Sequence, residues 1–296
     1  MTILEADLFL LNLPMGRIPS FLPPCRIPAL SRIDAVFARL RSQKKKGLVA
    51  YITGGDPSLK GTLEVIHVLE ASGVDMLELG IPFSDPLADG PIIQAAIHRA
   101  LRAGANVEKI LELISHLRKS SSFPIILFTY LNPIYFYGMR RFLADAISAG
   151  ADGLLVLDLP PDEASCNEDL AVGNHQLQVI QLVSPTTPRD RIPCLVNAAQ
   201  GFIYCVSREG VTGERSEIAT ALRAQVQSIR QHTSLPIAVG FGISTPDQVK
   251  TVAGYADAVV IGSAIVRRIA EYASSPRWLS RIEEFVEPLV ETLLME

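Results

Sequence analysis

From residue 47 onward, short apolar runs alternate with stretches in which apolar residues recur at helical spacing. Several of the runs are apolar at every position, as in parallel strands that are buried on both faces. Between them, amphipathic stretches such as Leu63–Leu69 and Phe142–Ile147 predict helices, and Gly or Pro marks most of the turns. The predicted strands are Leu48–Ile52, Met76–Leu79, Pro124–Thr129, Gly153–Val156, Gln178–Leu182, Phe202–Val206, Ile237–Val239 and Ala258–Ile261.

This order of elements places the chain in the α/β class, as either a closed barrel or an open sheet with helices on both faces. The strand spacing is regular, and no GxGxxG motif opens the first strand–helix unit, so closure is favoured. The pattern therefore predicts one (β/α)8 barrel, the TIM-barrel fold, over residues 31–296. The long connection from Gly80 to Ser122 predicts an extra helix after the second strand, and Pro276 to Leu294 predicts a final packing helix.

A helix is also predicted before the first strand. There Ile33, Val36, Phe37 and Leu40 recur at helical spacing behind Ser31, a candidate N-cap. We expect this helix to plug the bottom of the barrel.

Residues 1–30 lie outside the pattern and predict a loosely ordered extension. An apolar Phe9-Leu10-Leu11 is followed by five prolines. Glu5 and Asp7 stand where a signal peptide would carry positive charge, so secretion is disfavoured. A transit peptide should also be poor in acids, and the segment fits that class badly as well.

Charge and hydropathy exclude further classes. The formal net charge of −4 argues against binding to a nucleic-acid backbone, which needs clustered cations. The basic run Lys44-Lys45-Lys46, with Arg39 and Arg41, ends a predicted helix, where it complements the helix dipole. A solvated helix end is therefore favoured over a binding patch. No apolar run reaches the roughly 18 residues that a membrane span requires.

Cysteines and histidines give no sign of a metal site, and none is predicted. The five histidines are far apart and the four cysteines show no CxxC spacing. Scattered cysteines in a long chain fit a reducing compartment. The cytoplasm is the expected location, or a plastid if the source is a plant or an alga. The cysteines are Cys25, Cys166, Cys194 and Cys205.

The strongest candidates for chemistry follow the second predicted strand. Glu78 is a carboxylate inside an apolar strand, which is costly to bury and so points to a role, although a salt-bridged strand end is an alternative. The loop Gly80 to Pro91 contains Asp89, for which capping of the next helix is the alternative role. In a barrel of this kind, chemistry sits at the carboxyl ends of the strands, where both carboxylates are expected.

Three late strands end in glycine-containing turns that predict a phosphate site. Strand six runs into Ser207–Gly213, strand seven into Gly240-Phe241-Gly242, and strand eight into Gly262-Ser263. Glycines let backbone N–H groups approach an anion closely, and Ser263 begins a helix whose dipole favours negative charge. Phosphate sites in such barrels commonly lie at strands seven and eight.

Five strings of the sequence together resemble the tryptophan synthase α-chain family, in order, from about Ser31 to the C-terminus. Only the first thirty residues lie outside the family pattern. The strings are Tyr51-Ile52-Thr53-Gly54-Gly55-Asp56-Pro57, Leu77–Pro91, Ser184-Pro185-Thr186-Thr187-Pro188, Ser207–Gly213 and Gly240-Phe241-Gly242-Ile243.

The resemblance implies a lyase that cleaves indole-3-glycerol phosphate to indole and glyceraldehyde 3-phosphate by a retro-aldol reaction. It implies that Glu78 is the general acid and base, and that Asp89 accepts a hydrogen bond from the indole N–H. The physical reading agrees, because two carboxyl groups in different settings can hold different protonation states. We expect the pKa of partly buried Glu78 to be raised toward neutrality and Asp89 to stay ionised.

The resemblance also implies the remaining contacts. The substrate phosphate would bind the backbone at Gly213, Gly242, Gly262 and Ser263. The loop beyond Arg208, with Thr212, resembles a mobile lid that closes against Asp89. The indole ring would lie among Tyr51, Ile93, Phe128, Tyr204 and Phe241.

Members of the family normally work with a pyridoxal-phosphate-dependent β chain in an αββα assembly. The resemblance therefore implies that no cofactor is held by this chain, that indole passes to the partner, and that Pro82, Asp85 and the lid lie near the shared interface.

Three alternatives stay open at this point. The first is a stand-alone lyase that releases free indole. The second is a phosphosugar isomerase or decarboxylase that shares the phosphate site but does not need the Glu78 loop. The third is a non-catalytic regulatory subunit, against which the intact Glu78 and Asp89 argue.

Overall fold

The computed structural model describes residues 30–165, 177–206, 215–240 and 242–294. The chain divides into two units, Met1–Leu30 and Ser31–Glu296. The predicted extension falls almost wholly outside the described residues. No helix of the described part is long and apolar enough to cross a membrane.

The described strands form one parallel sheet whose order follows a barrel. The order is β5-β4-β3-β2-β1-β9-β8-β7-β6. All eight pairings between neighbours are parallel. The strands are β1 Gly47–Thr53, β2 Met76–Gly80, β3 Ile125–Thr129, β4 Gly153–Val156, β5 Gln178–Val179, β6 Gln181–Val183, β7 Ile203–Val206, β8 Ile237–Gly240 and β9 Ala258–Ile261.

The predicted fifth strand, Gln178–Leu182, is two short strands. β5 pairs only with β4, and β6 pairs only with β7, so the two short strands stand at opposite edges of the sheet order. Ile180, which lies between them, still donates its N–H to Leu154 O at 2.9 Å. The two edges of the sheet are thus consecutive in the sequence, and the sheet is a nearly closed barrel. The other predicted strands are confirmed, with ends that differ by about one residue.

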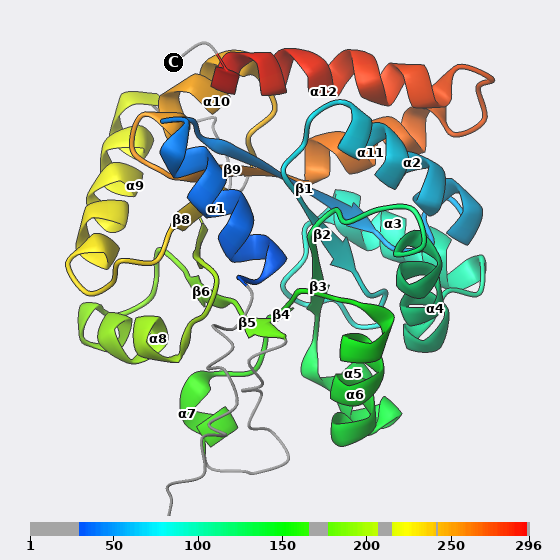
Figure 1. Cartoon of the computed structure of the whole chain (residues 1–296), viewed down its shortest axis with the longest axis horizontal. Coiled ribbons are helices and arrows are strands. Elements are labelled where there is room, and N and C mark those ends of the chain that lie inside the picture. The colour runs from blue at the N-terminus through cyan, green and yellow to red at the C-terminus, as the bar shows by residue number, and fades with distance from the viewer. Residues whose placement is uncertain (1–29, 166–176, 207–214, 241, 295–296) are drawn as a thin grey trace, which may run out of the picture. The chain divides into compact units, whose positions relative to one another are not determined.

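Helices surround the strands and alternate with them along the chain (Figure 1). Two helices, α3 and α4, stand between β2 and β3, which confirms the predicted extra helix. The helices are α1 Arg32–Ser42, α2 Leu59–Ala71, α3 Pro91–Arg102, α4 Val107–Leu117, α5 Leu131–Tyr137, α6 Met139–Ala149, α7 Pro161–Ser165, α8 Ile192–Ala198, α9 Arg215–Arg230, α10 Pro246–Ala253, α11 Ser263–Tyr272 and α12 Trp278–Leu294; a 3-10 turn spans Arg189–Arg191.

Alternate residues of each strand belong to different apolar clusters, because successive side chains point to opposite faces. On β1, Leu48 and Ile52 pack in the large cluster formed with the surrounding helices. Val49 instead packs with residues from the other strands, such as Met76 and Ile126. Both faces of the sheet are therefore buried, which explains why these strands are apolar throughout.

Helix α1 contacts the amino ends of several strands. Its buried side chains Ile33, Phe37 and Leu40 belong to the same cluster as the inward residues of the strands. The Cδ1 atoms of Leu40 and Ile33 lie where side chains of Gly47 and Gly153, the first residues of β1 and β4, would project. Ser31 caps the helix as predicted, accepting from the N–H of Asp34. That α1 acts as a plug stays a prediction, which these contacts support.

Aspartate side chains stabilise three of the turns that lead into strands. Asp75, Asp152 and Asp257 directly precede β2, β4 and β9. Each carboxylate accepts the backbone N–H of a residue on a neighbouring strand and pairs with at least one arginine. Asp75 accepts from Leu48 and Arg39. Asp152 accepts from Ile125, Arg32 and Arg118. Asp257 accepts from Ile237 and Arg230.

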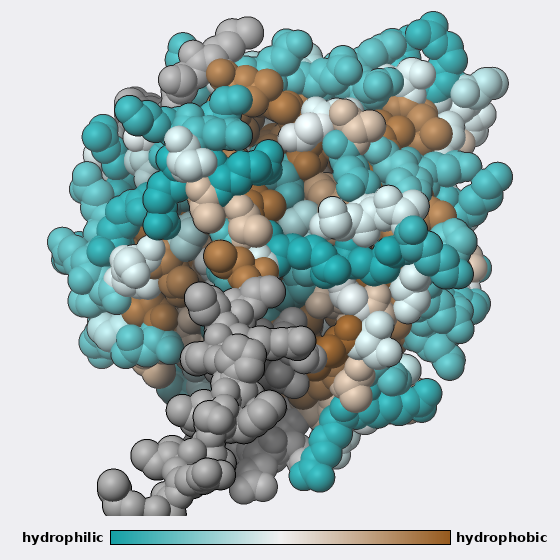
Figure 2. Space-filling model, viewed as in Figure 1, coloured by the Kyte–Doolittle hydropathy of each residue, from teal (hydrophilic) through white to brown (hydrophobic). Residues whose placement is uncertain are grey.

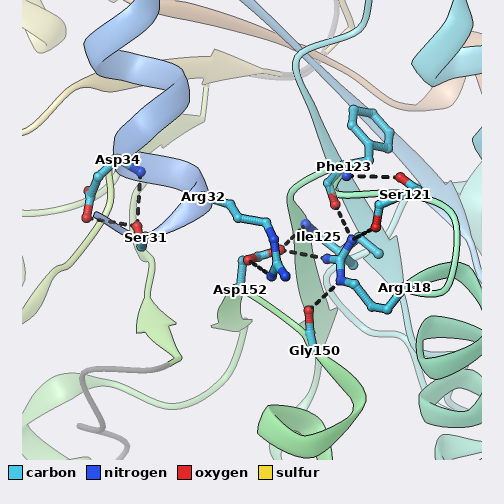
Figure 3. Close-up of polar contacts among 9 residues, drawn as sticks. All are labelled: Ser31, Arg32, Asp34, Arg118, Ser121, Phe123, Ile125, Gly150 and Asp152. Atoms are coloured by element: carbon cyan, nitrogen blue, oxygen red, sulfur yellow. Dashed lines mark hydrogen bonds and ion pairs between the residues drawn. The ribbon is translucent and has the colours of Figure 1, made fainter. Parts of the chain in front are cut away.

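Asp152 pairs with two arginines, and Figure 3 shows these contacts. It is 5% exposed and accepts from Arg32, Arg118 and the Ile125 N–H, each at 2.8 Å. Arg32 belongs to α1, so this carboxylate joins α1 to β3 and β4. Because the acid is buried, its ion pairs are screened less than surface pairs.

We predict that Asp152→Asn lowers the free energy of unfolding by about 2–3 kcal/mol, since it leaves Arg118 half-paired in a buried setting. Urea unfolding at pH 7 measures the change. Glu284→Gln is the control, because its pairs with Arg277 and Arg281 are exposed and worth less than about 1 kcal/mol. Equal effects of the two variants would contradict this role for Asp152.

Candidate active site

Glu78 lies inside the barrel, in the middle of β2. It faces Tyr51 of β1 and Ile126 of β3 in the strand register. The residue is 0% exposed, and neither carboxyl oxygen has a hydrogen-bond partner among the described residues. Burial alone raises the pKa of Glu78 to about 8. The direction agrees with the expected shift toward neutrality, and Glu78 forms no ion pair with any described residue, which argues against a salt-bridged strand end.

An acid in this setting is held in its neutral form at pH 7. A buried carboxylate without donors would lose its hydration and gain nothing in return, so protonation is the less costly state. Unsatisfied buried polar atoms are rare in native proteins, and they concentrate where chemistry is done. Glu78 is therefore a candidate proton donor.

Asp89 lies in the loop after β2 and is oriented by a tyrosine. The hydroxyl of Tyr130 donates to Asp89 Oδ2 at 2.8 Å and accepts the Ala88 N–H at 3.0 Å. Burial raises the pKa of Asp89, while the hydrogen bond from Tyr130 opposes the rise. Gly90, not Asp89, is the N-cap of α3, so the alternative capping role is wrong.

Inside the barrel, the side chains of two tyrosines pack against glycines. The hydroxyl of Tyr51 occupies the space that a Cβ on Gly80 would fill, and the hydroxyl of Tyr204 lies 2.5 Å from a Cβ built on Gly240. Burial raises the pKa of both tyrosines, and the negative charges of Asp89 and Glu78 raise it further. Tyr51 also lies opposite Glu78 in the strand register.

The described residues of the predicted ring pocket lie close to one another. Tyr51 and Ile93 pack in one apolar cluster, in which Phe128 takes part. The rings of Tyr51 and Phe128 meet edge to face, with centroids 5.1 Å apart. Phe128 also packs against the cluster that contains Tyr204. Phe241, the fifth predicted residue, lies outside the described residues.

The predicted phosphate site is described only in part. Gly242 follows β8 with a φ of +71°, a conformation that favours glycine. Gly262 is the N-cap of α11 and Ser263 is its first residue, so a helix N-terminus is presented after β9 as expected. A Cβ on Gly262 would meet the Tyr51 Cβ at 3.2 Å, which places this end of α11 beside the ring pocket. Gly213, Arg208 and Thr212 lie outside the described residues.

Sequence reasoning missed two contacts. Tyr130 directly follows β3, and its position at the carboxyl end of a strand was the available signal. Asp56, 0% exposed, accepts two hydrogen bonds of 2.8 Å from Arg99 of α3. This pair ties the turn after β1 to the helix that carries Ile93. No sequence signal identifies it, because the two residues are far apart in the chain.

The described part of the chain contains no group of three or more His, Cys, Asp or Glu side chains placed to hold a metal ion. Cys205 is buried and Cys194 is exposed, and neither is in a disulfide. What the described residues offer is a buried acid and a second carboxyl group beside an apolar ring pocket, with a helix N-terminus nearby for an anion.

A family model for the tryptophan synthase alpha chain matches residues 37–293. The tryptophan synthase alpha chain of Geotalea uraniireducens is 49% identical over 243 residues, which cover 82% of this chain and 91% of the relative. That of Carboxydothermus hydrogenoformans is 44% identical over 264 residues, 89% of this chain and 98% of the relative.

Solved structures of the same family share the fold. The alpha subunit from Legionella pneumophila has a TM-score of 0.81 at 38% identity and covers 90% of this chain and 99% of its own. A ligand-free tryptophan synthase from M. tuberculosis has a TM-score of 0.79 at 31% identity, with 89% and 99% covered.

We predict that Tyr130→Phe raises the pKa of Asp89, because the hydroxyl that stabilises the ionised form is removed. Carbon-13 NMR titration of the carboxyl groups measures this pKa. Tyr137→Phe is the matched control, since its hydroxyl donates to exposed Asp145 on α6. An unchanged pKa of Asp89 in Tyr130→Phe would contradict the role of the hydrogen bond.

Proposed function

The chain belongs to the tryptophan synthase alpha chain family, and from that premise we propose that Glu78 carries out the proton transfers of the family's reaction. The chain is a lyase that cleaves indole-3-glycerol phosphate and passes indole to a β subunit. The observation that supports Glu78 most directly is its complete burial without a hydrogen-bond partner.

The bond to be broken joins C3 of the indole ring to a carbinol carbon of the glycerol chain. The ring leaves poorly unless C3 is protonated, which makes an indoleninium that can accept the bonding electrons. Glu78 is neutral at pH 7, because its pKa is about 8, so it can give this proton. The resulting carboxylate then accepts the hydroxyl proton as the carbon–carbon bond breaks and the carbonyl forms. Glu78 thereby returns to its starting state.

Asp89 stabilises the charge on the ring in this proposal. Protonation at C3 places positive charge on the indole nitrogen, and an ionised carboxylate that accepts the N–H stabilises it. The hydroxyl of Tyr130 fixes Asp89 Oδ2, leaving the other oxygen for the substrate. Two carboxyl groups with different partners thus take different roles.

Binding of the substrate phosphate positions the indole ring next to Glu78. We assign it to the backbone at Gly213, Gly242 and Gly262 and to Ser263, where the dipole of α11 favours an anion. The ring lies among Tyr51, Ile93, Phe128, Tyr204 and Phe241. We assign Arg208 and Thr212 to a lid that excludes water and closes against Asp89.

An exposed apolar surface next to the site suits the β subunit. Phe136 and Tyr135 of α5 are 92% and 74% exposed, and Leu87 in the Asp89 loop is 93% exposed. The Ala88–Tyr130 hydrogen bond holds this loop beside the start of α5, so the three side chains come from adjoining segments. Large apolar side chains exposed together are typical of protein interfaces.

We propose that this surface, with exposed Asp85, contacts the β subunit in an αββα assembly in the cytoplasm. Pro82 is buried within the chain and contributes through the shape of the loop. Pyridoxal phosphate is assigned to the partner subunit. An interface beside the strand ends gives indole a short path out of the ring pocket.

We predict that Glu78→Gln lowers turnover of indole-3-glycerol phosphate by roughly 10²–10⁴-fold, because an amide can neither give nor take the proton. The variant should still bind glyceraldehyde 3-phosphate. In the unchanged chain, kcat should fall as pH rises through about 8, since the acid form of Glu78 is lost. Glu112→Gln, an exposed acid on α4, is the control. Turnover that survives Glu78→Gln would overturn the assignment.

We predict that Phe136→Asp weakens binding to a tryptophan synthase β subunit by roughly 10-fold or more, since a charge replaces an apolar contact. Titration calorimetry measures the affinity, and indole release without the β subunit should stay the same. Leu294→Asp is the control, because Leu294 is exposed at the far end of α12. Unaltered affinity in Phe136→Asp would place the interface elsewhere.

A further inference from the structure

A basic pocket lies at the end of the barrel opposite to Glu78 and Asp89. Its volume is about 280 Å³, near the lower end for small-molecule sites. It is formed where the carboxyl end of α1 meets the residues that lead into β8 and β9. The lining residues are Phe37, Leu40, Arg41, Lys44, Lys45, Lys46, Pro236 and Asp257.

The charge of the lining is strongly unbalanced. Four lining residues are cationic and only Asp257 is acidic. Asp257 is already neutralised, because Arg230 pairs with it at 2.7 Å and Lys46 lies 3.9 Å away. No ion pair is formed by Arg41 or Lys44 with any described residue. The negative end of the α1 dipole is equivalent to only about half a charge. A net positive charge therefore faces the pocket.

The base of the pocket is apolar. Phe37 and Leu40 are each 5% exposed, and Pro236 completes this side. The surface around this end of α1 is mainly hydrophilic in the space-filling view (Figure 2). A cationic rim over an apolar base suits a ligand with an anionic head and an apolar body.

The backbone of Lys44 has a strained conformation that lowers the stability of the fold. Its φ is +55°, and it is the one non-glycine residue of the described part with a positive φ. Its N–H donates to Arg41 O, and Lys45 N–H donates to Leu40 O, as at helix ends that usually carry glycine. A side chain in this conformation is strained, because its Cβ comes too close to the following carbonyl oxygen. Strain of this kind concentrates at functional sites.

We propose that this pocket binds a small aromatic anion, a carboxylate or phosphate on a single ring. The cations of the α1 carboxyl end hold the anionic head, and Phe37, Leu40 and Pro236 contact the ring. The bound anion links α1 to the amino ends of β8 and β9. The sequence alone favours a solvated helix end for this basic run, and the apolar cavity beneath it is what the structure adds.

The test is an amide NMR titration of the full chain with phenyl phosphate and with benzoate. Inorganic phosphate supplies the head alone and benzyl alcohol the ring alone. The amides of Lys45, Gly47 and Asp257 should shift together with both aromatic anions, and much less with the two half-ligands. This pattern separates the pocket from the active site, whose reporters are Gly80 and Gly262. No shift at the three pocket amides would overturn the proposal.

Two variants sharpen the test. Lys44→Gln with Lys45→Gln should weaken binding about 10-fold, since each lost partly exposed contact is worth roughly 0.5–1 kcal/mol. Lys119→Gln, on an exposed turn, should change nothing. Lys44→Gly should raise the Tm by about 1–3 °C while it weakens binding, because it relieves the backbone and removes a cation. Retained affinity in the double variant would overturn the proposal.

Discussion

The burial of Glu78 without a hydrogen-bond donor is the constraint on which the site depends. An acid in that position stays protonated, because none of the described residues donates a hydrogen bond to its carboxyl oxygens. In the proposed mechanism, this proton is therefore available to C3 of the substrate ring. The position is costly for folding, and the apolar packing of both faces of the sheet offsets that cost.

Closure of the barrel creates this environment. Parallel strands with alternating inward and outward residues place Tyr51 opposite Glu78, and Gly80 and Gly240 leave room for the phenol groups of Tyr51 and Tyr204. Outside the core, the Asp89 loop is held by Tyr130 at the start of α5. The hydrogen bond between Ala88 and Tyr130 joins the segment that carries exposed Leu87 to the start of α5, so the Asp89 loop and the proposed partner surface share one support.

Much of the fold and of the site follows from the sequence, because apolar runs report burial directly. The pattern predicts eight strand regions and the extra helix, and it singles out Glu78 as a carboxylate inside an apolar strand, whereas the ring pocket is implied by the family resemblance. The split at Ile180 is not predicted, since pairing to two different neighbours depends on the register of the closed sheet. The contact of Tyr130 with Asp89 and the Asp56–Arg99 pair are not predicted, because contacts between residues far apart in the sequence leave no local periodicity. The capping role considered for Asp89 was wrong, as Gly90 holds that position.

The most direct test of this account is the pKa of Glu78 itself, measured by carbon-13 NMR of the side-chain carboxyl groups. Glu78→Gln identifies the signal, because that variant lacks it. The account predicts titration near pH 8, where burial alone sets the protonation state. Titration near the ordinary value of about 4.5 would mean that the carboxyl group is solvated or paired, and would contradict its role as the proton donor.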